Sequence, residues 1–332
     1  MLFNILTLTE VKQQFTKPID VFIAFCSFEK RCLSVVKNLP LENVNASVVF
    51  VNNDADAQSE SLANLKEFEK ILGDKSKSVK VDLFDPIKLT DEMISVLTEI
   101  NKANLSSNLL VDITSFTHEA LLIFLAVIKL IFKNAEIVYI YNNAATYASE
   151  SENLAERWLS RGIKCVRSVL GYAGDIKPSQ DTVLIMMLGY EYERAWRVID
   201  TVSPEELIIT YNDSEGSTTQ LNCDAGEKHA GLLKELAAYY ENPKQYVVSS
   251  NNPFKTAIQL EEIVNKIDEK KNIIIVPMNN KLSTVGAAIV AFKKPEIQLC
   301  YAPAEIYNTS AYSVEGDKFY IFSFDNEERN PL

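Results

Sequence analysis

The first half of the chain alternates short apolar runs with segments whose apolar residues recur at helical spacing. Runs rich in Val, Ile and Phe predict buried strands, and apolar residues three or four positions apart predict helices. The predicted strands are 20–26, 46–51, 78–84, 108–113 and 136–141. The predicted helices are 29–39, 59–72, 90–103 (with Thr90 as its cap) and 118–133. This alternation is typical of a parallel sheet with helices on both faces.

The second half of the chain repeats the same alternation. Its predicted strands are 182–188, 206–211, 245–249, 272–278 and 296–301, with a closing strand at 318–324. Its predicted helices are 192–202, 225–240, 253–269 and 282–293. We therefore expect an α/β fold of two tandem Rossmann-like units with mainly parallel sheets. Turn residues place the boundary within 171–180, which gives a first unit with its connecting segment over 1–175 and a second unit over 176–332.

The two halves also match in residues, which predicts an internal duplication. The first strand and turn read FIAFCSFEKR from Phe22 and LIMMLGYEYER from Leu184, so each strand leads to a small residue, an aromatic, a Glu and an Arg. Near the ends of the halves, Glu136, Tyr141, Ala144 and Tyr147 recur as Glu296, Tyr301, Ala304 and Tyr307, at a constant offset of 160. The chain is then twice a unit of about 160 residues.

Composition narrows the range of functions. The chain has 33 Lys and Arg against 45 Asp and Glu, a net charge of −12, which disfavours a polymeric nucleic-acid partner and an anionic membrane surface. Five scattered cysteines and two histidines give no metal framework and fit a cytoplasmic protein. The chain has 10 glycines in 332 residues, and the turns after the first strand of each half contain one glycine between them. The glycine-rich motifs that bind dinucleotides or form P-loops are therefore excluded at these turns. We expect no cofactor and no metal.

The turn after the first strand of each half is a candidate ligand site. Each turn precedes a predicted helix, whose free N–H groups favour an anion, and its Arg could fork onto a phosphate or a carboxylate. The alternative is that the Glu occupies a favourable first turn and the Arg is solvated or paired with an acid. The candidates are Ser27, Phe28, Glu29 and Arg31 in the first half and Gly189, Tyr190, Glu191 and Arg194 in the second.

An acid follows the second strand of each half. Asp54 lies 27 residues beyond Ser27, and Asp213 lies 24 residues beyond Gly189. In Rossmann units an acid about 20 residues beyond the first turn binds ribose hydroxyls. The alternative is a polar loop cap, because Asn-Asp pairs are ordinary turn formers.

The turn after the fourth strand carries the most distinctive polar residues. Asp112 ends a strand that should be buried, so its carboxylate needs partners. Thr114, Ser115 and His118 would then lie at the carboxyl-terminal edge of the sheet; the alternative is helix capping by Ser115 or Thr117. The equivalent turn of the second half lacks the acid and supplies Asn279, Asn280 and Lys281. The two halves are therefore not chemically equivalent.

A family resemblance rests on these turns. The segment from Asp112 reads DITSFTH and resembles the Asp-Ile-Thr-rich motif after the fourth strand of CRISPR-associated Rossmann-fold (CARF) sensor domains, and Asn279-Asn280-Lys281 is loosely similar to a Lys-containing variant of that turn. The tandem arrangement over 20–150 and 181–325 resembles the SAVED sensor domains of bacterial antiviral systems. The resemblance implies binding of cyclic or linear oligonucleotide messengers. The family pattern usually has Gly and a basic residue after the Thr, where this chain has Ser115 to His118.

Together these observations favour a sensor or regulatory protein that binds a nucleotide-like small molecule, rather than an enzyme, and the resemblance places it in antiviral defence. One alternative is a nucleotide hydrolase that uses Asp112, Thr114 and His118. Another is a ligand-free interaction subunit of a defence complex. We expect a protein partner from the same operon and no membrane association, and the sequence is compatible with a homodimer.

Overall fold

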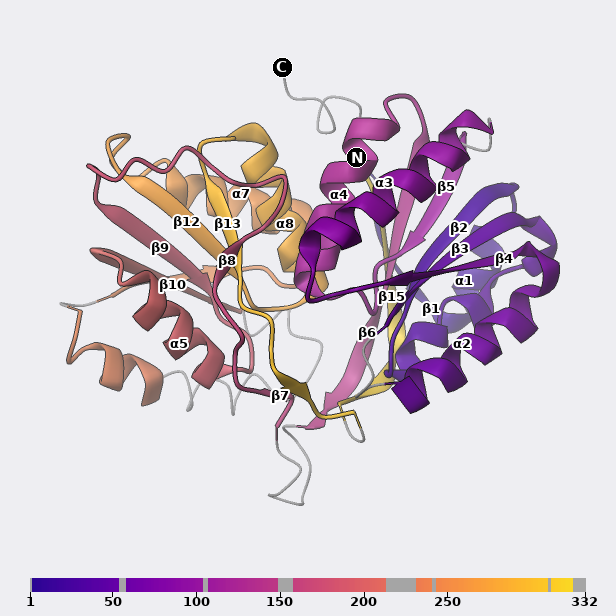
Figure 1. Ribbon diagram of the computed structural model, residues 1–332, viewed down its shortest axis with the longest axis horizontal. Helices are drawn as coiled ribbons and strands as arrows, with labels where there is room; N and C mark the ends of the chain where they lie inside the picture. The colour runs from indigo at the N-terminus through magenta and orange to yellow at the C-terminus, as the bar shows by residue number, and fades with distance from the viewer. Residues whose placement is uncertain are drawn as a thin grey trace. The chain divides into compact units, whose positions relative to one another are not determined.

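The structure is a computed structural model that describes residues 2–53, 58–103, 107–148, 158–212, 231–240, 243–309 and 312–324 (Figure 1). The chain divides into two compact units. The first unit comprises Met1–Tyr147 together with Thr309–Leu332, and the second comprises Ala148–Asn308. The segment 148–175, which we expected to belong to the first unit, therefore belongs to the second.

The first unit contains a seven-stranded sheet in the order β1-β15-β6-β5-β2-β3-β4. The five strands from β2 to β6 are parallel, whereas β15 is antiparallel to β6 and β1 is antiparallel to β15. The strand bounds are Leu2–Thr7 (β1), Ile19–Cys26 (β2), Val44–Asn52 (β3), Ser76–Val81 (β4), Asn108–Asp112 (β5), Glu136–Tyr147 (β6) and Ser313–Ser323 (β15).

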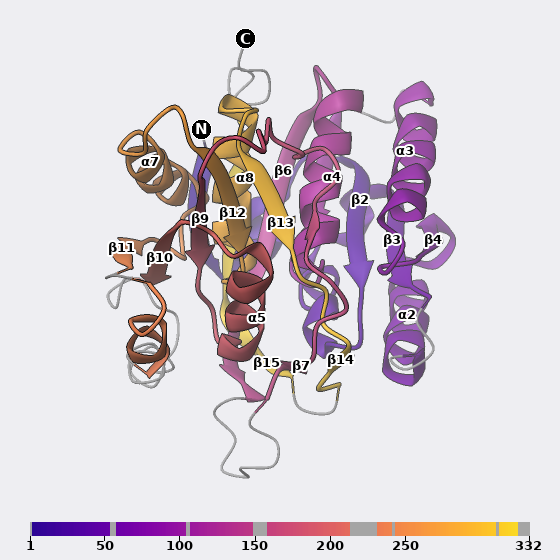
Figure 2. The same ribbon diagram turned by 60° about the vertical axis from the view of Figure 1, so that its left-hand side comes forward.

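Helices cover the faces of this sheet. The α3 and α4 helices pack side by side (Figure 2), and the short 3-10 segments share an apolar cluster with α2 and with Val11 of α1. Thr117 caps α4 by accepting from Ala120 N. The bounds are Leu8–Gln14 (α1), Lys30–Leu33 (η1), Val36–Asn38 (η2), Leu41–Asn43 (η3), Gln58–Leu72 (α2), Gly73–Lys75 (η4), Pro86–Lys102 (α3) and His118–Ile131 (α4).

The second unit contains a six-stranded sheet in the order β11-β10-β9-β12-β13-β8. All its neighbours are parallel except β8, which is antiparallel to β13, and a separate antiparallel pair joins β7 to β14. The strand bounds are Ser160–Arg161 (β7), Arg167–Ser168 (β8), Thr182–Met187 (β9), Glu206–Asn212 (β10), Lys244–Val248 (β11), Asn272–Pro277 (β12), Gln298–Tyr301 (β13) and Ile306–Tyr307 (β14).

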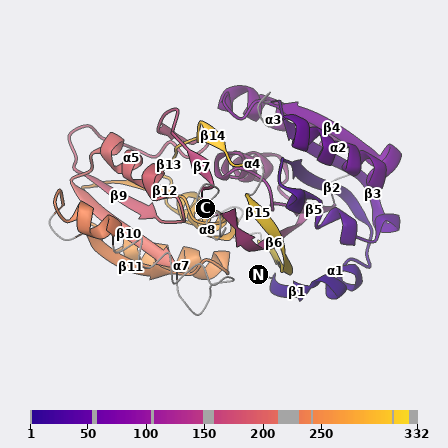
Figure 3. The same cartoon turned by 90° about the horizontal axis from the view of Figure 1, so that it is seen from below.

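The helices of the second unit lie on opposite faces of its sheet. Figure 3 shows α5 on one side and α7 and α8 on the other. The α5 face packs Ala195, Val198 and Ile199 on apolar side chains of β9 and β10, together with a helical stretch at 231–236. The bounds are Tyr192–Val202 (α5), Pro253–Val264 (α7) and Lys281–Lys293 (α8).

The strand orders confirm the α/β fold of two Rossmann-like units. When the parallel strands of each unit are numbered along the chain, both sheets have the order 3-2-1-4-5, which matches the first five strands of the Rossmann order 3-2-1-4-5-6. Both sheets also carry an antiparallel strand beside the fifth strand, β15 in the first unit and β8 in the second. This shared layout supports the duplication.

Three expected elements differ in the structure. The helix predicted at 29–39 is replaced by the 3-10 segments η1 and η2, in which backbone bonds such as Ser34 N to Arg31 O span three residues; all six residues from Arg31 to Val36 are buried. The third helix starts one turn earlier than predicted, because Asp85 caps it, and Thr90 donates to Pro86 O within it. The expected closing strand at 318–324 belongs to β15, in the first sheet rather than the second.

The predicted strands of the two halves otherwise coincide closely with observed ones, and β1 and α1 were not predicted. The predicted helix at 225–240 lies partly outside the described residues. Among the described ranges, no helix is both long and apolar enough to cross a membrane.

Candidate functional site

The candidate site lies at the carboxyl-terminal edge of the first sheet, where the strand order reverses between β2 and β5. Ligands of open α/β sheets bind at such switch points. The turn after β2 holds Ser27, Phe28 and Glu29, and the turn after β5 holds Thr114 and Ser115. Ser115 Oγ donates to Phe25 O and so ties the second turn to β2. The structure therefore brings together two of the predicted turns.

Asp112 is the buried acid of this edge. It is the last residue of β5, its side chain is 2% exposed, and its Oδ1 accepts from Thr114 N at 2.9 Å. Its Oδ2 is buried without a hydrogen-bond partner among the described residues. Burial raises the pKa of Asp112 to about 7, although the bonds from Thr114 and the charge of Arg31 act in the opposite direction. Asp112 is therefore a carboxyl group that titrates near neutrality.

Two threonines of the β5 turn form hydrogen bonds within the fold. Thr114 Oγ1 accepts from Asn142 N at 3.0 Å, and Thr117 caps α4. The capping alternative is thus correct for Thr117 but not for Ser115. His118 is the first residue of α4 and is half-buried.

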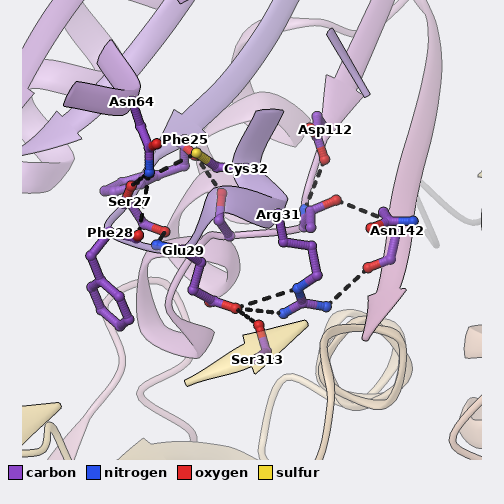
Figure 4. Close-up of polar contacts among 12 residues, drawn as sticks. Phe25, Ser27, Phe28, Glu29, Arg31, Cys32, Asn64, Asp112, Asn142 and Ser313 are labelled. Carbon is purple, nitrogen blue, oxygen red and sulfur yellow. Dashed lines mark hydrogen bonds and ion pairs between the residues drawn. The ribbon is translucent and has the colours of Figure 1, made fainter. Parts of the chain in front are cut away.

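Arg31 is held by an ion pair inside the first unit (Figure 4). Its side chain is 4% exposed, and its guanidinium lies 3.0 Å from Glu29 Oε2 and donates to the carbonyl oxygen of Asn142 at 3.0 Å. Glu29 also accepts from Ser313 Oγ of β15. The rings of Tyr141 and Tyr147 lie 5.9 Å from the Arg31 Cζ. We call this set of residues the first Arg clamp.

Arg194 is held in the same manner inside the second unit. It is 6% exposed, pairs with Glu191 and donates to the carbonyl oxygen of Ala302. Glu191 also accepts from Ser160 Oγ of β7. The ring of Tyr301 lies 5.8 Å from the Arg194 Cζ, and the hydroxyl of Tyr307 lies 3.4 Å from that of Tyr301. We call this set the second Arg clamp.

The two clamps correspond residue by residue. Asn142 and Ala302, Tyr141 and Tyr301, and Tyr147 and Tyr307 are each 160 residues apart, the offset found in the sequence. In both clamps the Arg is paired with an acid, which was the alternative to anion binding. A buried pair of this kind orders the turn, because leaving either charge unpaired inside the protein is costly.

The switch point of the second unit is built from amides and a close backbone approach. Asn212, at the end of β10, and Asn279 exchange side-chain hydrogen bonds, and Asn280 caps α8 and donates to Ser250 O. A Cβ on Gly189 would clash with Met278 O, so only glycine fits between these two turns. Lys281 is the first residue of α8.

The other candidates are placed only in part. Asp54 and Asp213 lie outside the described residues. Phe28 packs edge-on against Tyr312 at 5.5 Å, and Tyr190 is half-buried. Sequence reasoning missed the two serines, Ser160 and Ser313, because each comes from a segment far along the chain from its acid. The repeated tyrosines at offset 160 were the signal that could have led to the clamps.

Comparisons with known proteins add little to this site. No family model matches the sequence, and no curated protein matches it. Among solved structures, the chain is similar to the pyocyanin biosynthetic protein PhzM (12% identity, TM-score 0.23, 45% of this chain and 39% of that chain), so it spans about two fifths of that protein.

Two further solved structures are matched over more of their length. One is the cytoplasmic domain of a prokaryotic cation chloride cotransporter (11% identity, TM-score 0.26, 88% of this chain and 99% of that chain). The other is a universal stress protein from Archaeoglobus fulgidus (12% identity, TM-score 0.23, 86% and 96%). At such low TM-scores these likenesses carry no argument for function.

Proposed function

We propose that this protein binds a nucleotide-type ligand at the carboxyl-terminal edge of its first sheet and acts as a sensor or regulatory protein. The observation that carries the proposal is the buried Oδ2 of Asp112, which has no hydrogen-bond partner among the described residues and lies at the strand-order switch point. A buried polar atom without a partner costs free energy that a ligand can recover.

The chemistry of Asp112 suits a nucleotide. With a pKa of about 7, the carboxyl group is available in both protonation states near neutral pH. The protonated form donates to a phosphate oxygen or a ring nitrogen, and the ionised form accepts from a ribose hydroxyl or an exocyclic amine. Because Oδ2 is buried, ligand entry requires the residues that cover it to move.

The resemblance of this turn to CARF sensors extends the proposal to prokaryotic antiviral defence. In that setting the ligand is a linear or cyclic oligonucleotide messenger, and the partner is an effector protein encoded in the same operon. The net charge of −12 is compatible with a small ligand, whose phosphates need only local neutralisation.

Calorimetric titration tests the proposal with mononucleotides, dinucleotides and linear and cyclic oligoadenylates. We expect one class to bind the wild-type protein, and Asp112→Asn to weaken that binding about tenfold or more, as loss of a charge-assisted hydrogen bond predicts. Asp74→Asn, which alters an exposed acid of the same unit, should bind like wild type. Absence of binding by every nucleotide would contradict the proposal and favour a ligand-free interaction subunit.

A nucleotide hydrolase is the second candidate, and one observation favours it. A carboxyl group with a pKa of about 7 is suited to general acid–base catalysis at neutral pH. Phosphate release from the same nucleotides, lost in His118→Ala with an unchanged circular dichroism spectrum, would support this candidate over the sensor.

A further inference from the structure

The two large sheets end in four free edges among the described residues. These edges are formed by β1 and β4 in the first unit and by β11 and β8 in the second. A free edge presents unpaired N–H and C=O groups, on which a further strand can pair. Soluble proteins block such pairing with charged residues, prolines or bulges at the edge. The four edges can therefore be compared by what protects them.

Three of these edges carry basic residues. Lys77 and Lys80 lie on β4 and are exposed. The β11 strand begins with Lys244, and β8 contains Arg167. The β1 strand, in contrast, reads LFNILT and contains neither a charged residue nor a proline. It also pairs with β15 over all six residues without a register shift, so β1 is a regular edge strand that lacks these protections.

Apolar side chains of β1 are accessible on both of its faces. Because side chains alternate along a strand, Leu2 and Leu6 share one face with Asn4, and Phe3 and Ile5 share the other. Leu2 is 38% exposed and Ile5 is 49% exposed. Leu6 is half-buried against the apolar cluster of the first unit, and Phe3 is half-buried on the opposite face. A strand added beside β1 would therefore cover apolar surface on both faces.

The sequence of β1 complements itself in an antiparallel pair. When a twofold axis passes through Asn4, Leu2 faces Leu6 of the second copy, and Phe3 faces Ile5 of the second copy. Asn4 then faces its own equivalent, so apolar residues meet apolar residues and the two amides can exchange hydrogen bonds. The chain has a net charge of −12, which opposes contact between most surfaces of two copies, whereas β1 is neutral.

From these observations we propose that two copies of this chain associate through β1, whose antiparallel pairing joins their two seven-stranded sheets into one. The contact is isologous, because the same strand serves both copies, and the closed dimer leaves neither β1 edge free. Pairing of two six-residue strands is a small interface, so the dimer should form at micromolar concentrations. The association uses the first unit alone and does not depend on a ligand.

Sedimentation velocity on the full-length chain tests the pairing at protein concentrations from about 1 to about 200 μM. We expect the mass to rise from that of one chain towards that of two as the concentration increases. Asn4→Lys and Asn4→Asp each place like charges opposite one another at the twofold axis, and each should raise the dissociation constant about tenfold or more. An equimolar mixture of the two variants should associate at least as tightly as wild type, because opposite charges then meet.

The matched control is Ser78→Lys, which places the same charge at an exposed position of β4, the opposite edge of that sheet. This variant should dimerise like wild type. Three outcomes would overturn the proposal: a wild-type chain that stays monomeric over the whole range, an Asn4→Lys variant that dimerises like wild type, and a mixture that associates no more than its components. A β1 edge that serves a different protein instead gives the first of these outcomes.

Discussion

Asp112 shows how one buried side chain makes this protein sensitive to pH. A carboxyl group in water titrates near pH 4, whereas burial raises the pKa of Asp112 to about 7. Between these values the folded state holds a proton that the unfolded state has released. The contribution of Asp112 to the free energy of unfolding therefore falls as pH rises from about 4 to about 7, and that contribution is level above this range.

Replacement of Asp112 with Asn removes this pH dependence. The difference of about three pKa units corresponds to at most about 4 kcal/mol. We expect Asp112→Asn to match wild type near pH 4 and to gain stability relative to wild type up to that amount by pH 8. Urea unfolding at pH 5, 6, 7 and 8 measures it, and parallel curves for the two proteins would contradict the expected pKa.

Some of these residue environments could be predicted from the sequence and some could not. The burial of Asp112 was predictable, because a polar residue that ends an apolar strand has to be enclosed with it. The partner of Glu29 was not, because Ser313 lies 284 residues further along the chain and reaches Glu29 only through the antiparallel pairing of β15. For the same reason the sequence alone does not decide whether Arg31 binds an anion or pairs with an acid.

At the scale of elements, α7 and α8 meet at a glycine. A Cβ on Gly286 would lie 2.5 Å from Cβ and Cγ2 of Thr256 and 2.9 Å from Pro253 O. Thr256 has little freedom to move, since its hydroxyl donates to Ser249 O and Asn252 O. The two helices therefore pack so closely at Gly286 that only the hydrogen atom of a glycine fits there.

Gly286→Ala should destabilise the protein despite the better helix propensity of alanine. Overpacking of this kind lowers the free energy of unfolding by about 1–3 kcal/mol. Gly231→Ala is the matched control, because nothing lies within 4 Å of a Cβ there, and it should leave stability unchanged or raise it by up to about 1 kcal/mol. Equal effects of the two changes in urea unfolding would show that α7 and α8 tolerate the methyl group.

Prediction of elements succeeded for most strands and helices and failed at the segment after β2. The strands β2, β3, β5 and β9 were recognisable from their apolar runs. The segment after β2 has apolar residues at helical spacing, but its backbone bonds, such as Ser34 N to Arg31 O, span three residues, and it folds as η1 and η2. The spacing of apolar residues does not distinguish such 3-10 turns from an α-helix.

At the scale of the molecule, the ends of the chain contribute unequally to the first unit. The C-terminal strand β15 lies inside the sheet between β1 and β6, and its Phe319, Tyr320, Ile321 and Phe322 are at most 2% exposed. The N-terminal strand β1 is at the edge, and most of its residues are exposed. The first unit therefore depends on residues that follow the whole of the second.

Truncation after Asn308 should consequently unfold the first unit, although it removes only the end of the chain. We expect loss of near-ultraviolet circular dichroism and rapid proteolysis within β5 and β6, because four buried side chains and two strand pairings are lost. Deletion of residues 2–7 is the control and should be much milder. Slow hydrogen exchange retained in β5 and β6 of the truncated chain would contradict the expectation.

The duplication and the mainly parallel sheets were predictable at this scale, since both follow from repeated local patterns. The unit boundary was not, because turn signals at 171–180 report where the chain bends and not which sheet a segment joins. The short strand β7 carries too few residues for any pattern to assign it.

The segment that follows each repeat pairs with a strand of the other repeat: β15 pairs with β6 in the first unit, and β8 pairs with β13 in the second. This exchange of strands indicates how such a protein arises. A gene that encodes a single repeat with its trailing strand would make a chain whose strand is taken by a second copy, so that two copies complete each other as a domain-swapped homodimer. End-to-end fusion of two such genes would join the copies and preserve every pairing. Proteins that contain one such repeat should then be obligate dimers in which each copy contributes its trailing strand to the sheet of the other.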